Sequence, residues 1–125
     1  MPNWLKKENV KEHKVLITYE AIYDIADAEE YIFYEFGQER ANEYHTDIYN
    51  EIKSFANFCS YGSSGCFYRG YTIFKKPFKP AIIFGIIIGD EVHVLRVVRE
   101  EYDWQEFFNS HQYNEYHYPD NPIVQ

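Results

Sequence analysis

The sequence has few residues of the kinds that anchor disulfide-rich and metal-binding proteins. It contains two cysteines and one methionine among 125 residues. Cys59 and Cys66 match no common zinc-ligand spacing, and no second pair of Cys or His completes one. We therefore expect no metal or other cofactor, and two free thiols in a Gly/Ser-rich loop. A disulfide between them is the alternative if the chain meets an oxidant.

Long apolar runs are missing as well. The most apolar segment, Ala81–Ile88, has eight residues, whereas a helix that spans a membrane needs about 20. The first residues, MPNWLKKENVKEHK, include charges but no apolar stretch after them, so they do not form the pattern of a secretory signal peptide. These absences predict a cytoplasmic protein that does not act on a membrane.

Aromatic and apolar residues, in contrast, are abundant. Aromatic residues make up 20% and hydrophobic residues 46% of the chain, which predicts a folded domain rather than a disordered one. A length of 125 residues fits one domain with a buried core. We expect that domain to span residues 14–110, after a polar leader at residues 1–13. The tail at residues 111–125 is rich in Tyr, Asn and Pro, and we expect it to be loosely held.

Charge is distributed unevenly along the chain. The net charge is −8, yet residues 69–99 carry six basic residues against two acidic ones. Residues 20–39 contain seven carboxylates and no Lys or Arg. A protein with this total charge is not drawn to nucleic acid as a whole, but its basic segment could form a local surface for phosphates.

The first half of the chain predicts a strand followed by two helices. Residues 14–19 (KVLITY) are typical of a short strand, and Gly37 has the position of a glycine that ends a helix. Apolar residues on either side of this glycine recur at spacings of three and four, which indicates an antiparallel helical hairpin. We expect the aromatic residues of both helices in the core, and the carboxylates Asp24, Asp27 and Glu30 on a solvated face. The two periodic series are Ile22, Ile25, Glu29, Ile32 and Phe36, and then Ala41, Tyr44, Ile48, Ile52 and Phe55.

The second half predicts a loop, three strands and a short helix. Residues 59–66 (CSYGSSGC) have the composition of a loop, and β-rich runs follow at residues 68–75, 81–88 and 91–99. A turn at residues 77–80 separates the first two runs, and Gly89-Asp90 joins the last two as a hairpin. A helix at residues 103–110 completes the domain.

The element order β-α-α-β-β-β-α indicates an α+β fold, in which a helical hairpin packs on a mostly antiparallel four-stranded sheet. Ala81–Ile88 lacks polar alternation, so we expect it to be the central strand and to be covered on both faces. The helical hairpin can cover one face. The terminal helix, the tail or a partner chain would then cover the other.

Basic and aromatic residues gather where the last strand ends, in the sequence VHVLRVVREEYDW from Val92 to Trp104. Cleavage of RNA by its own 2′-hydroxyl needs a group that takes a proton and cations that stabilise the phosphate. Histidine is suited to proton transfer, and a tyrosine can stack on a base. The candidate catalytic residues are Arg69, Arg96 and Arg99 as cations, His93 and Tyr102, with Lys75, Lys76 and Lys79 as nucleic-acid contacts.

Each candidate also has a structural interpretation. Arg96 could pair with a helix carboxylate, His93 could be an ordinary sheet residue, and the lysines could belong to a solvated turn. Strict alternation along the strand predicts that His93 shares a face with Leu95, Val97 and Arg99, and that Arg96 lies on the opposite face.

A series of short sequence matches runs from residue 15 to residue 108. In the helical half they are Ala21, the pairs Asp24-Ile25 and Tyr31-Ile32, Gly37 and Ala41; in and after the last strand they are Leu95-Arg96-Val97 and Asp103. In this order the matches resemble the RelE/ParE family of toxins from type II toxin–antitoxin systems. The resemblance implies a RelE/ParE-like fold and a toxin that inhibits bacterial growth until a cognate antitoxin neutralises it.

The resemblance leaves the target open. Many members have a histidine at the end of the last strand, where this chain has Arg99, and a Tyr-Arg pair on the preceding strand, where it has Phe84-Gly85-Ile86. These departures and the acidic total favour inhibition of DNA gyrase, as in the ParE branch, over ribosome-dependent mRNA cleavage, as in the RelE branch. A third alternative is an inactive member that only binds protein, through its acidic helix and an exposed sheet face.

Overall fold

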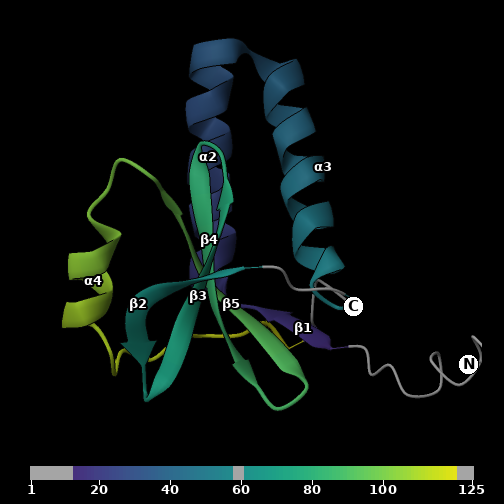
Figure 1. Ribbon diagram of the computed structural model, residues 1–125. Coiled ribbons are helices and arrows are strands. Elements are labelled where there is room, and N and C mark those ends of the chain that lie inside the picture. Colours follow the sequence, from purple (N-terminus) through teal and green to yellow (C-terminus); the bar gives the residue numbers. More distant parts are fainter. Residues whose placement is uncertain (1–12, 58–60, 121–125) are drawn as a thin grey trace, which may run out of the picture.

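The computed structural model describes residues 13–57 and 61–120, which form a five-stranded sheet with helices on both faces (Figure 1). Most of the predicted leader, Cys59 and the last five residues lie outside the described residues. In chain order the elements are β1 (Lys14–Ile17), α2 (Tyr19–Phe36), α3 (Gln38–Ser54), β2 (Gly62–Tyr68), β3 (Tyr71–Phe78), β4 (Ala81–Ile88), β5 (Glu91–Arg99) and α4 (Trp104–Ser110).

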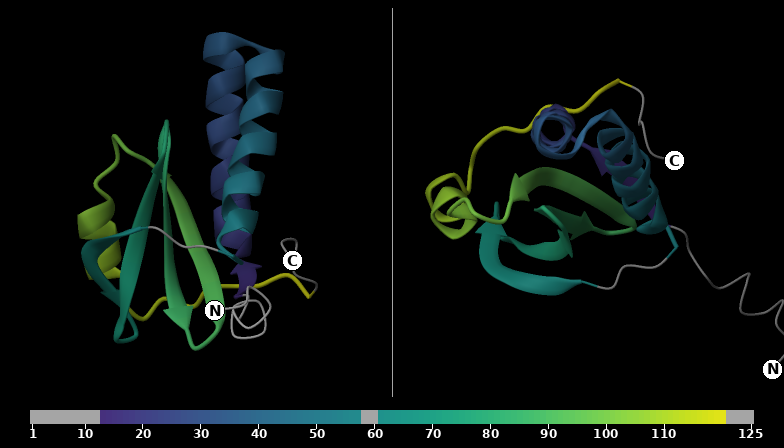
Figure 2. Two further views of the ribbon diagram at one scale, coloured as in Figure 1. Left: turned by 45° about the vertical axis from the view of Figure 1, so that its right-hand side comes forward. Right: turned by 90° about the horizontal axis from the view of Figure 1, so that it is seen from above.

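The strands lie in the order β1-β5-β4-β3-β2. Strand β1 runs parallel to β5, and the other three pairs are antiparallel. Helices α2 and α3 stand side by side over one face of the sheet, and α4 lies on the opposite side (Figure 2). Among the described residues, no helix is long and apolar enough to cross a membrane.

The predicted α+β fold is confirmed, but the sheet has five strands rather than four. The additional strand is β2, which occupies most of the Gly/Ser-rich segment that we expected to be a loop. Alternate side chains of β2 point into the protein, so Ser64 and Cys66 are buried although the strand contains few large residues. The Ser64 hydroxyl donates to the Ile73 carbonyl at 2.6 Å. The Cys66 thiol is free and buried.

The second correction concerns the hairpin that contains β2. A turn at Arg69-Gly70 divides the run that we expected as one strand at residues 68–75. Both turn residues have positive φ, 49° for Arg69 and 87° for Gly70, which suits the tight turns of antiparallel hairpins. Strand β3 then continues through Pro77, which we had assigned to a turn.

The core between the helical hairpin and the sheet follows the predicted periodicity only in part. All five residues predicted for α3 and its end are buried. Helix α2, however, buries Ala21, Ile25, Ala28 and Ile32, and Phe36 is 65% exposed. The small alanines take positions in the buried stripe, which lets α2 approach the sheet closely.

The second face of the sheet is covered by the chain itself. Phe84, Leu95 and Phe108 lie at the centre of a separate core, with Trp104 and Tyr116 packed against it. Tyr116 belongs to residues 112–118, which we call the strap because they run from α4 along the sheet to the start of α2 (Figure 1, yellow). A partner chain is therefore not needed to cover this face.

The expectation of a loosely held tail is wrong for the strap. The Arg69 amide donates to the Gln112 carbonyl at 3.0 Å, and the Tyr68 hydroxyl donates to the Asn114 carbonyl at 2.7 Å. At the other end, the Tyr19 amide donates to the His117 carbonyl at 2.7 Å. Composition predicted a loose tail because tyrosines were counted as loop residues, whereas here the Tyr116 ring packs in the core and the Tyr118 hydroxyl bonds to His93.

Candidate functional site

A β-bulge in β5 decides which side chains reach each face of the sheet. Phe84 pairs with Arg96 and Gly85 pairs with Val94, so Leu95 has no partner in β4. The extra residue shifts the alternation. Val97 therefore packs in the core under the helical hairpin, and Val98 packs on the α4 side.

This shift overturns the predicted distribution of β5 side chains. The Arg96 guanidinium lies 4.9 Å from the centre of the Phe107 ring on the α4 side. The Arg99 guanidinium lies 4.3 Å from the centre of the Tyr31 ring of α2, on the other side. His93, before the bulge, does not share a face with Val97 and Arg99 as strict alternation had predicted.

Arg96 is bound by Asp24 of α2. The two form a bidentate pair, with 2.6 Å from Nε to Oδ2 and 2.8 Å from Nη2 to Oδ1, and the Val97 amide donates to Asp24 Oδ2 at 2.9 Å. Burial raises the pKa of the Asp24 carboxyl, and the hydrogen bond from Arg96 opposes that shift. The expectation that Asp24 lies on a solvated face is wrong.

The Arg96–Asp24 pair lies beside the part of β5 that β1 does not cover. Strand β1 pairs with β5 only as far as Val94, so the edge of β5 is open from Leu95 onward. Thr18 donates its hydroxyl to the Leu95 carbonyl at 2.7 Å, and Asp24 accepts the next exposed amide. These contacts satisfy backbone groups that an edge strand otherwise leaves unpaired. Arg96 thus holds the sheet edge to α2, as in the structural interpretation of this residue.

Arg99 is as exposed as Arg96, with 24% of each side chain accessible to solvent, but it pairs with a far more exposed carboxylate. Its guanidinium lies between two tyrosine rings, 4.3 Å from the centre of Tyr31 and 5.2 Å from that of Tyr102, and forms an ion pair with Glu101. Glu101 is half exposed. Lys79 lies nearby, because the Glu100 amide donates to the carbonyl of the next residue, Pro80, at 3.1 Å. We call Tyr31, Lys79, Arg99, Glu101 and Tyr102 the rim.

Two hollows flank the rim. One of about 200 Å³ is lined by Arg96, Arg99, Tyr102 and the carboxylates Asp24 and Asp27. The other, of about 400 Å³, separates the helical hairpin from the turn between β3 and β4, and its lining includes Tyr31, Tyr44 and Lys79. Burial raises the pKa of the Tyr44 phenol far above its usual range, so this hydroxyl stays protonated. Because Asp24 and Asp27 line the first hollow together with Arg96 and Arg99, the cations of this region have carboxylates beside them.

His93 and Arg69 lie together at the opposite end of the sheet. Both line a hollow of about 390 Å³ beneath the strap, beside Glu115, Tyr116 and Tyr118. His93 Nδ1 is 2.8 Å from the Tyr118 hydroxyl, and Nε2 is 3.0 Å from Glu91 Oε1. Burial raises the pKa of Tyr118 to about 12. The predicted proton carrier is thus at the other end of β5 from Arg99.

The two lysines of β3 lie on opposite faces of the sheet, between these ends. The Lys75 ammonium is 5.4 Å from the centre of the Trp104 ring of α4. The Lys76 ammonium is 3.9 Å from Glu51 Oε1 of α3. They do not form one phosphate-binding stripe with Lys79.

The eight predicted site residues therefore divide into separate groups. Of the rim, sequence reasoning found Arg99, Tyr102 and Lys79 as site residues but missed Tyr31. The spacing of two residues between Arg99 and Glu101 was a local signal for their ion pair. Tyr31 comes from a distant helix, and the sequence carried no signal for its contact with Arg99.

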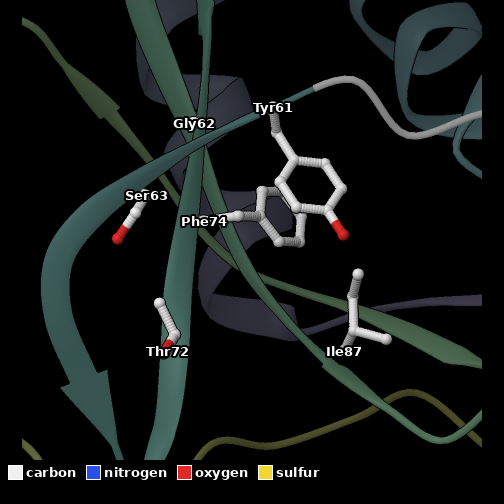
Figure 3. Close-up of a pocket in the computed structure, with 6 residues that line it drawn as sticks. All are labelled: Tyr61, Gly62, Ser63, Thr72, Phe74 and Ile87. Atoms are coloured by element: carbon white, nitrogen blue, oxygen red, sulfur yellow. The ribbon is translucent and has the colours of Figure 1, made fainter.

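A further hollow of about 290 Å³ is apolar. It is lined by Tyr61, Gly62, Ser63, Thr72, Phe74 and Ile87 (Figure 3). The rings of Tyr61 and Phe74 stack with centres 4.5 Å apart. None of its lining residues is charged, so this hollow offers apolar contact rather than acid–base chemistry. Among the described residues, no group of three or more His, Cys, Asp or Glu side chains is placed to hold a metal ion.

Comparison with known proteins supports the fold. No protein-family model and no curated protein matches the sequence. A solved structure described as the chromosomal ParDE TA system from P. aeruginosa is similar, with a TM-score of 0.59 and 19% sequence identity over 70% of this chain and 96% of that chain. At this level of identity the likeness shows a shared fold.

Proposed function

We propose that this chain is the toxin component of a type II toxin–antitoxin system, and that it inhibits bacterial growth by binding a protein target. DNA gyrase is the candidate target, and a cognate antitoxin would neutralise the toxin. The short sequence matches to RelE/ParE toxins and the fold shared with the ParDE structure support this proposal. The antitoxin is proposed because the similar structure is that of a ParDE TA system.

The observation that carries the choice of a protein target is the composition of the rim. Arg99 is held between two tyrosine rings, and Arg and Tyr are the residues most enriched where proteins bind proteins. Asp24, Asp27 and Glu101 lie beside the cations. These carboxylates would repel a phosphate backbone, whereas a protein surface can match both signs of charge.

The arrangement of the predicted catalytic residues supports the same choice. General base and phosphate-binding cations must meet within hydrogen-bond reach of one substrate. His93 lies under the strap, and Arg99 lies at the far end of the same strand. Arg96 is already bidentate to Asp24.

Ribosome-dependent mRNA cleavage is the second candidate, and one observation favours it. His93, Arg69 and several tyrosines share the hollow beneath the strap, which brings a proton carrier, a cation and stacking groups together. If the protein is a nuclease, we expect its activity to depend on this end of the sheet rather than on the rim.

The two candidates can be separated by inducing the chain in a bacterial host while mapping mRNA ends and gyrase-linked DNA breaks in the same cultures. We expect growth arrest with DNA breaks and intact mRNA. The double variant R99Q/Y102A should relieve the arrest at least tenfold, while R69Q/H93Q should retain it. K53Q is a matched control, because Lys53 is an exposed cation near the end of α3 and lines neither of the hollows beside the rim.

The opposite outcomes are informative. New mRNA ends that vanish in R69Q/H93Q and persist in R99Q/Y102A would establish the nuclease. Absence of arrest, with folded protein present in the cells, would contradict both toxin functions and favour the member that only binds protein.

A further inference from the structure

The outward face of α2 carries large aromatic side chains. Tyr19, Tyr23, Phe33 and Tyr34 are 40%, 65%, 42% and 75% exposed. We had expected these rings in the core, and that expectation is wrong. The buried stripe of α2 consists of alanine and isoleucine, so the aromatic residues occupy the side of the helix that is normally polar in a surface helix.

The exposed rings lie along one side of the helix rather than at scattered positions. Residues 19, 23, 30 and 34 recur at the spacings that place side chains on one side of a helix. From residue 19 to residue 34 the helix rises by fifteen steps of about 1.5 Å, so the stripe is roughly 22 Å long. Large apolar side chains exposed together on one side of a helix mark an interaction site. We call Tyr19, Tyr23, Asp27, Glu30, Phe33 and Tyr34 the aromatic stripe.

The aromatic rings contact one another only locally. The rings of Tyr19 and Tyr23 stack with centres 6.3 Å apart, and those of Phe33 and Tyr34 meet edge-on at 5.2 Å. Between these two pairs lie the exposed carboxylates Asp27 and Glu30. The stripe therefore has aromatic ends and an acidic centre.

Charge selects the partner. Helix α2 contains six carboxylates and no Lys or Arg. A second copy that docked through the same stripe, or a nucleic acid, would bring like charge to the acidic centre, which is unfavourable. A basic partner would pair with Asp27 and Glu30, and its cations could also lie over the tyrosine faces.

The backbone of the stripe selects the partner's conformation. The amides and carbonyls inside α2 are bonded within the helix, so an extended segment could not add to it as a strand would to a sheet edge. A helix recognises another helix through its side chains, with apolar groups inserted between the ridges.

We propose that the aromatic stripe of α2 docks a basic amphipathic helix of a partner protein, with aliphatic side chains packed among the tyrosines and Lys or Arg side chains facing Asp27 and Glu30. The proposal does not depend on toxin activity. It concerns a surface on the solvent side of α2, which meets the region of the rim only at Asp27, a residue that also lines the hollow beside Arg99 and Tyr102.

Binding can be measured with the purified full chain and a fluorescently labelled 18-residue helical peptide of Leu and Lys in an amphipathic pattern. A Leu/Glu peptide with the same pattern and a Leu/Lys peptide with scrambled order serve as comparisons. We expect the amphipathic Leu/Lys peptide to bind at least tenfold more tightly than either, and its affinity to fall with added salt.

Two double variants locate the site. Y23A/Y34A should lower the affinity at least tenfold, and D27N/E30Q should lower it and flatten the salt dependence. All four residues are exposed or solvent-facing, so both variants should keep the circular dichroism spectrum of the parent. Y113A is the matched control, because Tyr113 is 78% exposed and lies in the strap; it should bind like the parent.

Several results would overturn the proposal. These are no saturable binding of the amphipathic Leu/Lys peptide, equal binding of the Leu/Glu peptide, or loss of affinity in Y113A as large as in Y23A/Y34A. An NMR titration with the peptide in which amide shifts change only outside α2 would also overturn it.

Discussion

At its start, strand β5 presents His93 to the strap; at its end, it presents Arg96 and Arg99 to α2. Both ends bring charged or titratable side chains to the surface, yet the two environments differ. The histidine contacts one hydroxyl and one carboxylate. Of the two arginines, one is held by a half-buried carboxylate and the other lies between aromatic rings with an exposed partner.

The difference shows how a single strand can separate structural and functional cations. The bulge at Leu95 directs Arg96 around the open sheet edge and Arg99 to the helical hairpin. Arg96 therefore completes the sheet edge, whereas Arg99 pairs with an exposed carboxylate and packs against two tyrosine rings. Both residues are arginines on one strand, and the register of that strand decides which of them holds the sheet edge and which packs against the tyrosines.

The largest expected effect comes from replacing Gly85, whose missing side chain leaves room for the bulge in β5. A Cβ at Gly85 would lie 2.4 Å from the His93 carbonyl oxygen and 2.6 Å from Cζ of Phe74. We expect G85A to destabilise the protein by about 3 kcal/mol, because backbone and a core ring must both shift. Chemical denaturation measures the change.

The matched control for that change is G62A. A Cβ at Gly62 meets nothing within 4 Å, and its φ is not positive. We expect its stability to differ from the parent by less than about 0.5 kcal/mol. Equal losses in G85A and G62A would mean that the close approach at the bulge does not matter.

The second prediction contrasts the two arginines through their partners. D24N should cost about 2 kcal/mol, because it leaves the Arg96 guanidinium partly buried without a countercharge and weakens the bond to the Val97 amide. This loss is smaller than that expected for breaking a fully buried ion pair, because the Arg96 side chain is 24% exposed. D27N, at an exposed carboxylate on the same helix, should change stability by less than about 0.5 kcal/mol.

Thermal or urea unfolding of both variants tests this contrast. If the free energies of unfolding of D24N and D27N agree within error, the Arg96–Asp24 pair does not stabilise the sheet edge.

The third prediction concerns the rim and rests on the proposed function. E101Q removes the countercharge of Arg99 but leaves the tyrosine rings in place. Stability should change by less than about 1 kcal/mol, because Glu101 is half exposed. Growth inhibition should become stronger, since the guanidinium no longer has to exchange one carboxylate for another on the target.

Dose–response curves of induction against growth measure this effect, with E106Q on α4 as the control. Weaker inhibition by folded E101Q would mean that Glu101 itself contacts the target.

These contrasts also show which parts of the molecule its sequence could predict. Hydrophobic periodicity placed α3, β4 and β5, because their side chains repeat with the period of the element. For α2 it predicted the helix with Ile25 and Ile32 in the core, but it missed the buried alanines and wrongly placed Phe36 in the core. It failed for β2, where Ser and Gly form an edge strand that needs few large side chains.

The site was less predictable for a related reason. One extra residue in β5 changes the face of every side chain beyond it, and no local word in the sequence marks the bulge. The cause lies in β4, where Gly85 leaves room for the His93 carbonyl. The contacts of Arg99 with Tyr31 and of Arg96 with Asp24 join residues that are far apart in the sequence and depend on that register.

The smallest expected effect is at the start of β5 and α2, where His117 of the strap donates its amide to Glu20 Oε1 at 3.0 Å and its Nδ1 lies 2.7 Å from Oε2. The hydrogen bond and charge of Glu20 raise the pKa of His117 above 6.5. Burial alone would raise the pKa of Glu20, but its hydrogen bonds with His117 outweigh this and lower it below 4.5.

The sign of the pH dependence follows from these two shifts. The contribution of His117 is complete below pH 6.5 and is lost as the pH rises through its raised pKa. The contribution of Glu20 is complete above pH 4.5 and is lost as the pH falls through its lowered pKa. The strap should therefore be held most firmly between these two values. The Tyr19 amide, which donates to the His117 carbonyl, should exchange with solvent a few-fold faster at pH 8 than at pH 5.5 after correction for intrinsic rates, and H117Q should remove this dependence. If H117Q and the parent show the same pH dependence, the strap is held by its tyrosines alone.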